Sequence, residues 1–396
     1  MRAARRWKLW TAILGLALVA SGFLSLGIGS ADVGVGDAWK VVAGALSSAL
    51  RGAGLESAPG EALDAGASAG ASAGGAVGTR PGAAQPDGAD QRAGLARDRA
   101  VAAPARAADP AARIVLQLRL PRTILSLLAG GLLAIAGVVM QAFFRNPMAD
   151  PYLVGVSAGA ALGAVLAMLL GWTLRFAWFS PVPLAAFSGA LVAVGIVYAV
   201  HRAPGGTRAE GLLLSGLAAS AAISAVVALL LVTSQRAVQQ VLFWLLGSLA
   251  AARWDHVLIV LPYALIGLVV VCLLARDLDL LLWGDATGAA LGAHVARTRA
   301  LLLGAASLMA AAVVAVSGVV GFVGLMVPHA ARFLVGTGHR RLLPSAFLLG
   351  GLLLLWADIL ARTLRSPTEL PLGAITAIIG APFLVYLCAR SGRKRW

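Results

Sequence analysis

Long apolar runs, bounded by charged residues, proline or glycine, dominate this chain. A helix that crosses the hydrocarbon core of a membrane needs about 20 mostly apolar residues. Ten such runs lie at about 10–29, 122–144, 152–171, 182–200, 211–232, 256–275, 300–317, 321–336, 345–364 and 372–390. A further apolar stretch at 241–250 is too short to span and suits a re-entrant or interfacial helix. The pattern predicts an all-α polytopic membrane protein with about ten transmembrane helices.

The first 50 residues combine a basic start with an apolar run. The small residues at 29–31 resemble the cleavage site of a signal peptide. The run is longer than a usual signal core, so we interpret it as an uncleaved first span, with cleavage as the alternative. Residues 33–50 carry Trp39 and Lys40 among Val, Ala and Leu, a pattern that suits a short amphipathic helix in the membrane interface.

Residues 51–113 are rich in alanine and glycine and lack the large apolar side chains that would offset the entropy of ordering them. From Arg51 to Arg113 there are seven arginines and seven acidic residues, so the segment adds nothing to the net charge. We expect a disordered periplasmic insert ahead of a core at 114–396. A tolerated loop insertion explains it, and a mobile binding arm is the functional alternative.

Composition and charge support the membrane class. The chain is 60% hydrophobic and 12% charged, whereas about a quarter of a soluble globular chain is charged. Its net charge of +15 could suit nucleic acid, but the basic residues are strung singly between apolar runs. With a cytoplasmic N-terminus, alternate loops place sixteen basic and five acidic residues inside. We therefore expect a multi-pass membrane protein with both termini cytoplasmic and no nucleic-acid partner.

Signals for an enzyme are weak. None of the three lysines lies in G-x-x-x-x-G-K-[ST], so an ATP-driven function would need a partner subunit. The sequence GVSAG at 155–159 matches G-x-S-x-G, which makes an intramembrane serine protease using Ser157 the rival hypothesis. That motif needs a strand–turn–helix context, whereas here it lies in an apolar helix. Gly155, Gly159 and Gly163 recur every four residues, which favours close packing of a neighbouring helix. His329 has no cysteine or carboxylate at ligand spacing, so we expect no metal site and no cofactor.

Two segments could act at the inner side. The sequence RNPMADP at 145–151 interrupts a helix, because its two prolines remove backbone donors. It could be a plain loop, or Asn146 and Met148 could border the inner mouth of a pathway. The loop at 277–299 is amphipathic, and two short helices around Gly284 and Gly288 fit it. This loop could be the binding site of a separate ATPase subunit. The alternative is that its helices only pack against the rest of the chain.

Three arginines lie at the outer boundary, against the positive-inside trend: Arg119, Arg122 and Arg362. They could anchor helices to lipid phosphate or dock an acidic partner. Asp358 lies four residues before Arg362, so the two share a helix face and could neutralise each other.

Six motifs together resemble the FecCD-type permeases, which are membrane subunits of ABC importers for iron-siderophore chelates, haem and vitamin B12. The motifs are LRLPR at 118–122, RNPMADP at 145–151, GVSAG at 155–159, FWLLG at 243–247, GFVGLMVPH at 321–329 and ELPLG at 369–373. The resemblance covers 113–390 closely and 1–50 loosely. It implies a vitamin B12 importer permease-like fold of about ten spans, a location in the bacterial inner membrane, and a homodimer with a pathway along its axis.

The same resemblance implies two kinds of partner and no enzymatic activity of the chain itself. A periplasmic substrate-binding protein would dock on Arg119, Arg122 and Arg362, and Asn146 and Met148 would form the cytoplasmic gate. A separate cytoplasmic ATP-binding subunit would hydrolyse ATP and contact the coupling segment 277–299. The coupling residues would be Leu281, Gly284, Asp285, Gly288, Leu291 and Gly292. An iron-siderophore is the first expected cargo, then haem, then cobalamin.

Overall fold

The structure, a computed structural model, describes residues 2–28, 34–52, 110–172, 180–202, 209–233, 238–292 and 294–391. These residues form helices and connecting turns, and they contain no strand. The prediction of an all-α protein is confirmed. The Ala/Gly-rich insert predicted at 51–113, except for its first two and last four residues, lies outside the described residues.

Ten helices correspond one to one with the ten predicted spans. They are α1 (Arg2–Gly27), α5 (Leu120–Phe143), α6 (Val156–Leu169), α7 (Pro181–His201), α8 (Ala209–Thr233), α10 (Trp254–Leu273), α13 (Val295–Ser317), α14 (Val323–Val335), α15 (His339–Thr363) and α16 (Leu372–Ser391). Among the described residues, seven helical stretches are long and apolar enough to cross a membrane, and α6, α14 and α16 are shorter apolar helices.

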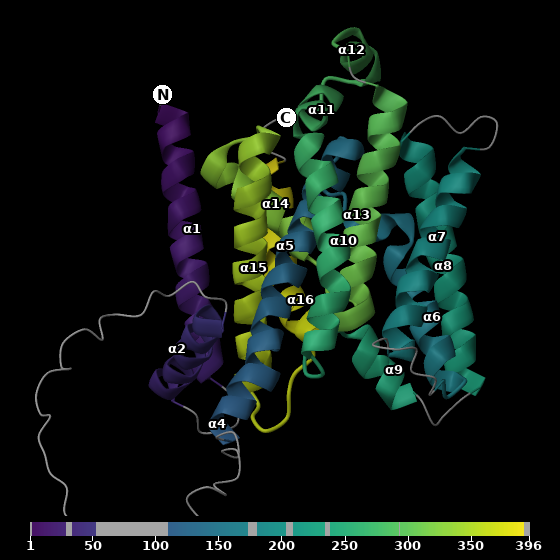
Figure 1. The fold of residues 1–396 in the computed structure, drawn as a ribbon. Coiled ribbons are helices and arrows are strands. Elements are labelled where there is room, and N and C mark those ends of the chain that lie inside the picture. The colour runs from purple at the N-terminus through teal and green to yellow at the C-terminus, as the bar shows by residue number, and fades with distance from the viewer. Residues whose placement is uncertain are drawn as a thin grey trace, which may run out of the picture.

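Short helices fill the connections between these spans. The predicted interfacial helix is α2 (Val35–Gly52), the predicted re-entrant helix is α9 (Val238–Leu245), and the inner loop holds α11 (Ala275–Leu281) and α12 (Asp285–Ala290). The remaining short elements are α4 (Pro110–Arg113), the π-helical turn η1 (Ile114–Arg119) that joins α4 to α5, and the 3-10 turn η2 (Pro151–Val154). Figure 1 shows α11, α12 and the first residues of α1 at one end, hereafter the α12 end, and α4 at the opposite end, the α4 end.

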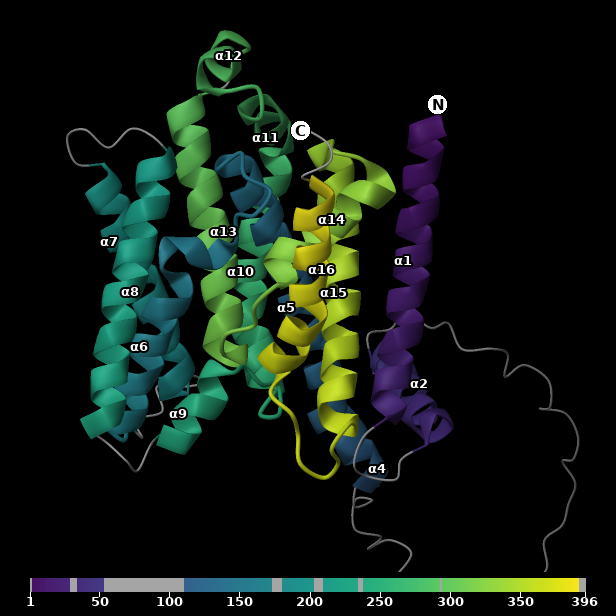
Figure 2. The ribbon, with the colours of Figure 1, turned by 180° about the vertical axis from the view of Figure 1, so that it is seen from behind.

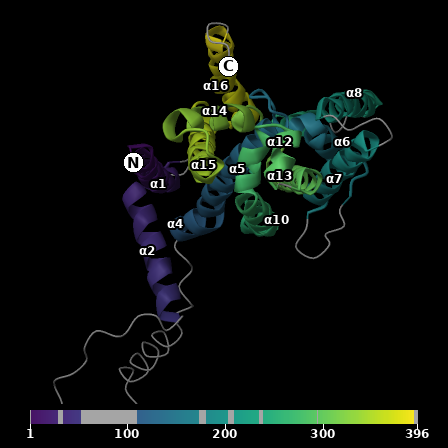
Figure 3. The same ribbon diagram turned by 90° about the horizontal axis from the view of Figure 1, so that it is seen from above.

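Helix α5 is the axis of the bundle. In the view of Figure 3 it crosses the centre, and it contacts α10, α13, α14 and α15. Glycines allow these contacts because a Cβ at Gly130 would overlap the backbone of Gly350 in α15, and one at Gly137 would overlap the backbone of Gly324 in α14. Small residues at helix crossings are how membrane helices approach closely.

Helices α6 and α14 each cover only part of the height of the bundle. Figure 2 shows α6 toward the α4 end and α14 toward the α12 end. The irregular segments that precede them meet, because the Tyr152 hydroxyl donates a hydrogen bond to the Val320 carbonyl at 3.0 Å. The Val320 carbonyl at the interruption before α14 is thus paired within the protein, as hydrocarbon surroundings require.

A second set of backbone bonds ties α13, α16 and the turn after α9 together. The Ser248 amide donates to the Ser317 carbonyl at 2.8 Å, and the Leu372 amide donates to the Gly247 carbonyl at 2.9 Å. The end of α13 and the start of α16 are therefore held at the same turn.

The tight α5–α14 crossing generates a stability prediction. We expect Gly137→Ala to destabilise the protein by about 1–3 kcal/mol, the usual cost of overpacking, because the new methyl group meets backbone that cannot rotate away. Thermal unfolding in detergent measures this. Gly304→Ala in α13 is the control, since a Cβ there meets nothing within 4 Å. Equal thermal midpoints for the two variants would contradict the assigned crossing.

Candidate functional site

The connection between α5 and α6, residues 144–155, is a tightly bonded loop, and we call it the gate loop. Asn146 Oδ1 accepts a hydrogen bond from the Met148 amide at 2.9 Å, and Asp150 Oδ1 accepts one from the Tyr152 amide at 2.9 Å. Arg145 has a φ of +48°, which is unusual for a residue with a side chain. Burial raises the pKa of the Asp150 carboxyl to about 6. The predicted gate residues thus project from a defined turn, with Asn146 exposed and Met148 half-buried.

The predicted coupling segment forms a short projection whose ends are fixed by glycine. Gly284 and Gly292 flank α12 with φ of +97° and +90°, values that favour glycine over any residue with a Cβ. Leu281 and Gly288 are buried, whereas Leu291 is 56% exposed. Asp285 and Gly292 are exposed as well, so Leu291 is the exposed one of the two leucines and not the one accessible residue of the set.

The base of α12 contacts the gate loop. Asp285 forms an ion pair with Arg299 of α13 at 2.7 Å, and the Arg299 guanidinium lies 5.2 Å from the ring centroid of Phe143, the last residue of α5. Arg145 Nη1 lies 3.3 Å from the position that a Cβ on Gly284 would take. The gate loop and the coupling segment therefore form one contiguous structure at the α12 end.

Sequence reasoning missed Trp283, the residue just before the turn into α12. Its side chain is 75% exposed, and that of its neighbour Leu282 is 45% exposed. Both belong to a run of apolar residues, so hydropathy alone could not separate them from the buried Leu281. The available signal in the sequence was a tryptophan directly before a glycine in an inner loop.

At the α4 end, one arginine binds two carboxylates. Arg122 of α5 donates to Asp358 through Nε and Nη2 at 2.8–3.1 Å, and to Glu369 through Nη1 and Nη2 at 2.8 and 2.9 Å. Asp358 is 1% exposed, so its charge depends on these partners. The predicted pairing of Asp358 with Arg362 is also present, at 3.6 Å, but Arg122 is the closer partner.

The other two arginines of this cluster hold the last turn of α1. Arg119 Nη1 donates to the Leu26 carbonyl at 2.7 Å, and Arg362 donates to the Ser25 and Ile28 carbonyls at 3.1 and 2.9 Å. The final carbonyls of a helix have no partner within the helix, and its dipole favours positive charge there. Two guanidiniums therefore cap α1 from helices distant in sequence.

These contacts change the sequence interpretation of the outer arginines. Arg119 is 6% exposed and Arg362 is 7% exposed, so neither projects toward solvent as a lipid anchor or a docking residue would. The sequence could not reveal this, because the main partners of Arg119 and Arg362 are backbone carbonyls at the end of α1, and the two carboxylates that bind Arg122 lie more than 200 residues away from it. Arg122, partly exposed and beside the exposed edge of Glu369, is the member of the cluster that an incoming group could reach.

The three glycines at 155, 159 and 163 have two different structural roles. Gly159 and Gly163 lie against the backbone of α7, at Gly189 and Ala185, as expected for packing glycines. Gly155, by contrast, precedes α6 with a φ of +88° and ends the turn η2, so its role is conformational and not close packing. Ser157 lies in the first turn of α6, and no histidine or carboxylate of the described residues is hydrogen-bonded to it. The strand–turn–helix context of a hydrolase serine is missing from this part of the chain.

Comparison with known proteins gives the geometry its context. The sequence profile of the FecCD transport family matches residues 97–390. The chain belongs to the FecCD transport family. It is 47% identical over 274 residues to the cobalamin import system permease of Halobacterium salinarum, covering 69% of this chain and 73% of the relative. It is 40% identical to the hemin transport system permease of Yersinia pestis, covering 71% and 85% of the two chains. It is also 40% identical to the Fe(3+) dicitrate permease FecD of Escherichia coli, covering 70% and 85%.

A solved structure agrees with this assignment. A metal-chelate type ABC transporter in an inward-facing conformation superposes with a TM-score of 0.71 and 28% identity, covering 96% of this chain and 98% of the other. The protein is therefore a multi-pass permease subunit of the ABC importer class and resides in the inner membrane. As a permease it is a transport subunit, which removes the ground for the serine-protease hypothesis.

The buried ion pairs of this permease generate a second prediction. We expect Asp358→Asn to destabilise the protein by about 3–5 kcal/mol, because it leaves two buried guanidiniums without their shared carboxylate. Asp37→Asn is the control, since its pair with Lys40 is largely exposed and should contribute less than about 1 kcal/mol. Thermal unfolding of both variants in detergent is the measurement. A small loss for Asp358→Asn would show that the cluster does not hold α1, α5 and α15 together.

Proposed function

We propose that this permease imports a metal chelate, driven by an ATP-binding subunit at the α12 end and supplied by a substrate-binding protein at the α4 end. The three relatives described above are named for cobalamin, hemin and Fe(3+) dicitrate, which are all metal complexes. An iron-siderophore is the first candidate cargo. Cobalamin is the second, supported by the 47% identity to a cobalamin permease.

The observation that carries the mechanism is the contact between the coupling segment and the gate loop. A push on the exposed Trp283 and Leu291 would move α12, whose base is tied through Asp285 to Arg299. Arg145 at the start of the gate loop lies against the same base. Closure of the ATP-binding subunits would thus displace Asn146 and Met148 directly, without a signal passing through the rest of the bundle.

The charge distribution supports the proposed orientation. Alternate inner segments hold sixteen basic and five acidic residues, and this excess supports an orientation with the α12 end and both termini in the cytoplasm. A second permease subunit, in the simplest case another copy of this chain, would cover α16 and α8. In one subunit these helices expose Ile378, Val385, Leu229 and Val232 to 67% or more.

Docking of the binding protein would take place at Arg122 by exchange of partners. Arg122 already binds Asp358, which is buried, and Glu369, which is 35% exposed. An incoming carboxylate would therefore compete with Glu369, while Asp358 keeps the guanidinium in place. Arg119 and Arg362 would contribute by holding the surface in shape and by their charge.

Transport itself is tested with the permease and its ATP-binding subunit in proteoliposomes. Uptake of the iron-siderophore should require ATP and the ATP-binding subunit, and competition with haem and cobalamin ranks the cargoes. Gly284→Ala should reduce uptake severalfold, because a Cβ is strained at that φ and would approach Arg145. Gly304→Ala should leave uptake unchanged. Uptake that persists without the ATP-binding subunit would refute the mechanism.

Partner exchange at Arg122 is tested by Glu369→Gln. Removing the competing charge should tighten docking of the substrate-binding protein by about threefold, the size expected from one partly exposed ion pair. Asp255→Asn is the matched control, because Asp255 lies in the first turn of α10, where Trp254 donates a hydrogen bond to the Leu116 carbonyl of η1, and it forms no ion pair with any described residue. Surface plasmon resonance with the permease in nanodiscs measures both. Equal effects of the two variants, or weaker docking by Glu369→Gln, would contradict the exchange.

A further inference from the structure

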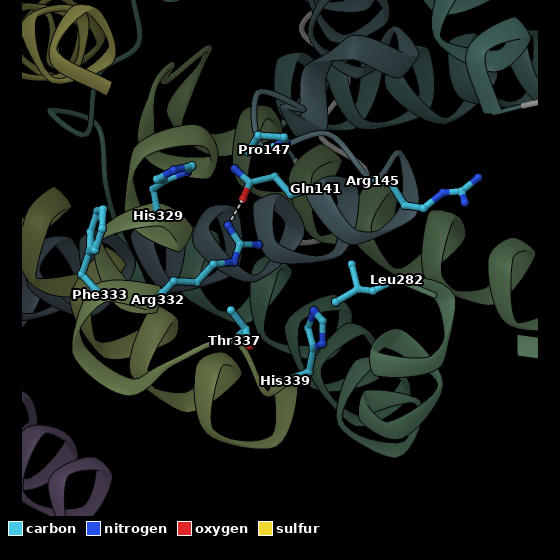
Figure 4. A pocket seen from close by; sticks show the side chains of 9 residues that line it. All are labelled: Gln141, Arg145, Pro147, Leu282, His329, Arg332, Phe333, Thr337 and His339. Atoms are coloured by element: carbon cyan, nitrogen blue, oxygen red, sulfur yellow. Dashed lines mark hydrogen bonds between the residues drawn. The ribbon is translucent and has the colours of Figure 1, made fainter. Parts of the chain in front are cut away.

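A cavity of about 510 Å³ opens at the α12 end, and its lining carries positive charge. Figure 4 shows the residues that surround it, drawn from α5, the gate loop, α14 and the start of α15. Two guanidiniums, Arg145 and Arg332, and two imidazoles, His329 and His339, contribute to the lining. Of the described residues that line it, none is acidic. Its volume lies within the range of small-molecule sites, roughly 300–1,000 Å³.

The central cation is held in place by a neutral side chain. Arg332 Nη1 donates to Gln141 Oε1, and Gln141 Nε2 donates to the Leu325 carbonyl at 3.1 Å, so the amide is fixed at both ends. Gln141 is 3% exposed, whereas Arg332 is half-buried. In the described part of the chain, neither Arg332 nor Arg145 forms an ion pair. A guanidinium held by an amide keeps its full charge and further N–H donors for another group.

A carboxylate next to the cavity, outside its lining, is bound to His339. Asp279 of α11 accepts hydrogen bonds from the backbone amide and ring Nδ1 of His339, at 3.1 and 2.6 Å. Asp279 thereby fixes the imidazole, and it forms no ion pair with Arg145 or Arg332. The cavity is thus organised to receive an anion.

The surroundings of the cavity indicate which anion. The cavity lies where α14 ends and α15 begins, which is the end of the apolar spans and so the boundary between hydrocarbon and water. Phe333 and Leu282 form an apolar part of its lining and are 59% and 45% exposed. Basic pockets between helices on the cytoplasmic side of a membrane are typical sites for phospholipid head groups. We propose that this cavity binds a phosphate group, supplied by an anionic phospholipid whose acyl chains lie along Phe333 and Leu282.

The assignment to a lipid rests on the proposed orientation, but its test requires neither ATP nor transport, so the two can fail separately. Delipidated full-length permease in detergent is titrated with dihexanoyl phosphatidylglycerol, dihexanoyl phosphatidylcholine and inorganic phosphate, and bound adducts are counted by native mass spectrometry. We expect phosphatidylglycerol to bind in preference to the other two.

Variants locate the site. Arg332→Gln should weaken phosphatidylglycerol binding by roughly tenfold, the loss expected for one charge-assisted hydrogen bond. Because Arg332 contacts Gln141, that variant could also affect folding, so Arg145→Gln is the second variant; its side chain is exposed and makes no hydrogen bond to a described residue. Arg340→Gln is the matched control, an exposed arginine in the first turn of α15 that does not line the cavity.

Two results would overturn the proposal. Inorganic phosphate that binds as tightly as phosphatidylglycerol would remove the lipid as the source of the phosphate. Equal binding by wild type, Arg145→Gln and folded Arg332→Gln, or an equal loss in Arg340→Gln, would remove the cavity as the site.

Discussion

The buried carboxylate of Asp358 is the interaction on which the outer half of this permease depends. A carboxylate 1% exposed would be prohibitively costly alone, and here it is compensated by Arg122 from α5 and by Arg362 one turn further along α15. Arg362 also donates hydrogen bonds to carbonyl groups at the end of α1, as Arg119 does. Asp358 and the arginines around it therefore link α1, α5 and α15, three helices that are far apart in the sequence.

The inner half is organised by backbone geometry more than by charge. Gly284 and Gly292 give α12 its bounds, and Arg145 and Gly155 adopt positive φ at the two ends of the gate loop. These conformations fix where the chain turns, so the coupling segment and gate loop meet without a large apolar interface. Such an arrangement suits an element that has to move, because few buried contacts oppose its displacement.

The sequence predicted the helices well and the site contacts poorly. Ten apolar runs became ten helices because hydropathy over about 20 residues is a strong signal, and even α9 and the pair α11–α12 followed from shorter apolar patterns. Arg119 and Arg362 donate to backbone carbonyl groups, which every residue carries, so no residue type in the sequence could identify these partners. Gly155 was grouped with Gly159 and Gly163 by spacing, but the helix starts one residue later than that grouping requires. Periodicity cannot locate such a boundary.

The two ends of the permease are connected by elements of different rigidity. Helix α15 is anchored at both ends, by Asp358 and Arg362 near the α4 end and by the His339–Asp279 contact at the α12 end. Glu369 lies beyond α15, in the loop that leads to α16, and the first residues of α16 bond to the turn after α9 through Leu372 and Gly373. A displacement of that loop would therefore reach α9 and α16 through these bonds, and α15 through the hydrogen bond that the Leu370 amide donates to the Ala361 carbonyl at 2.8 Å. In one subunit the second half of α16 is largely exposed, for example at Ile378 and Val385, so little packing within the subunit restrains that half of the helix.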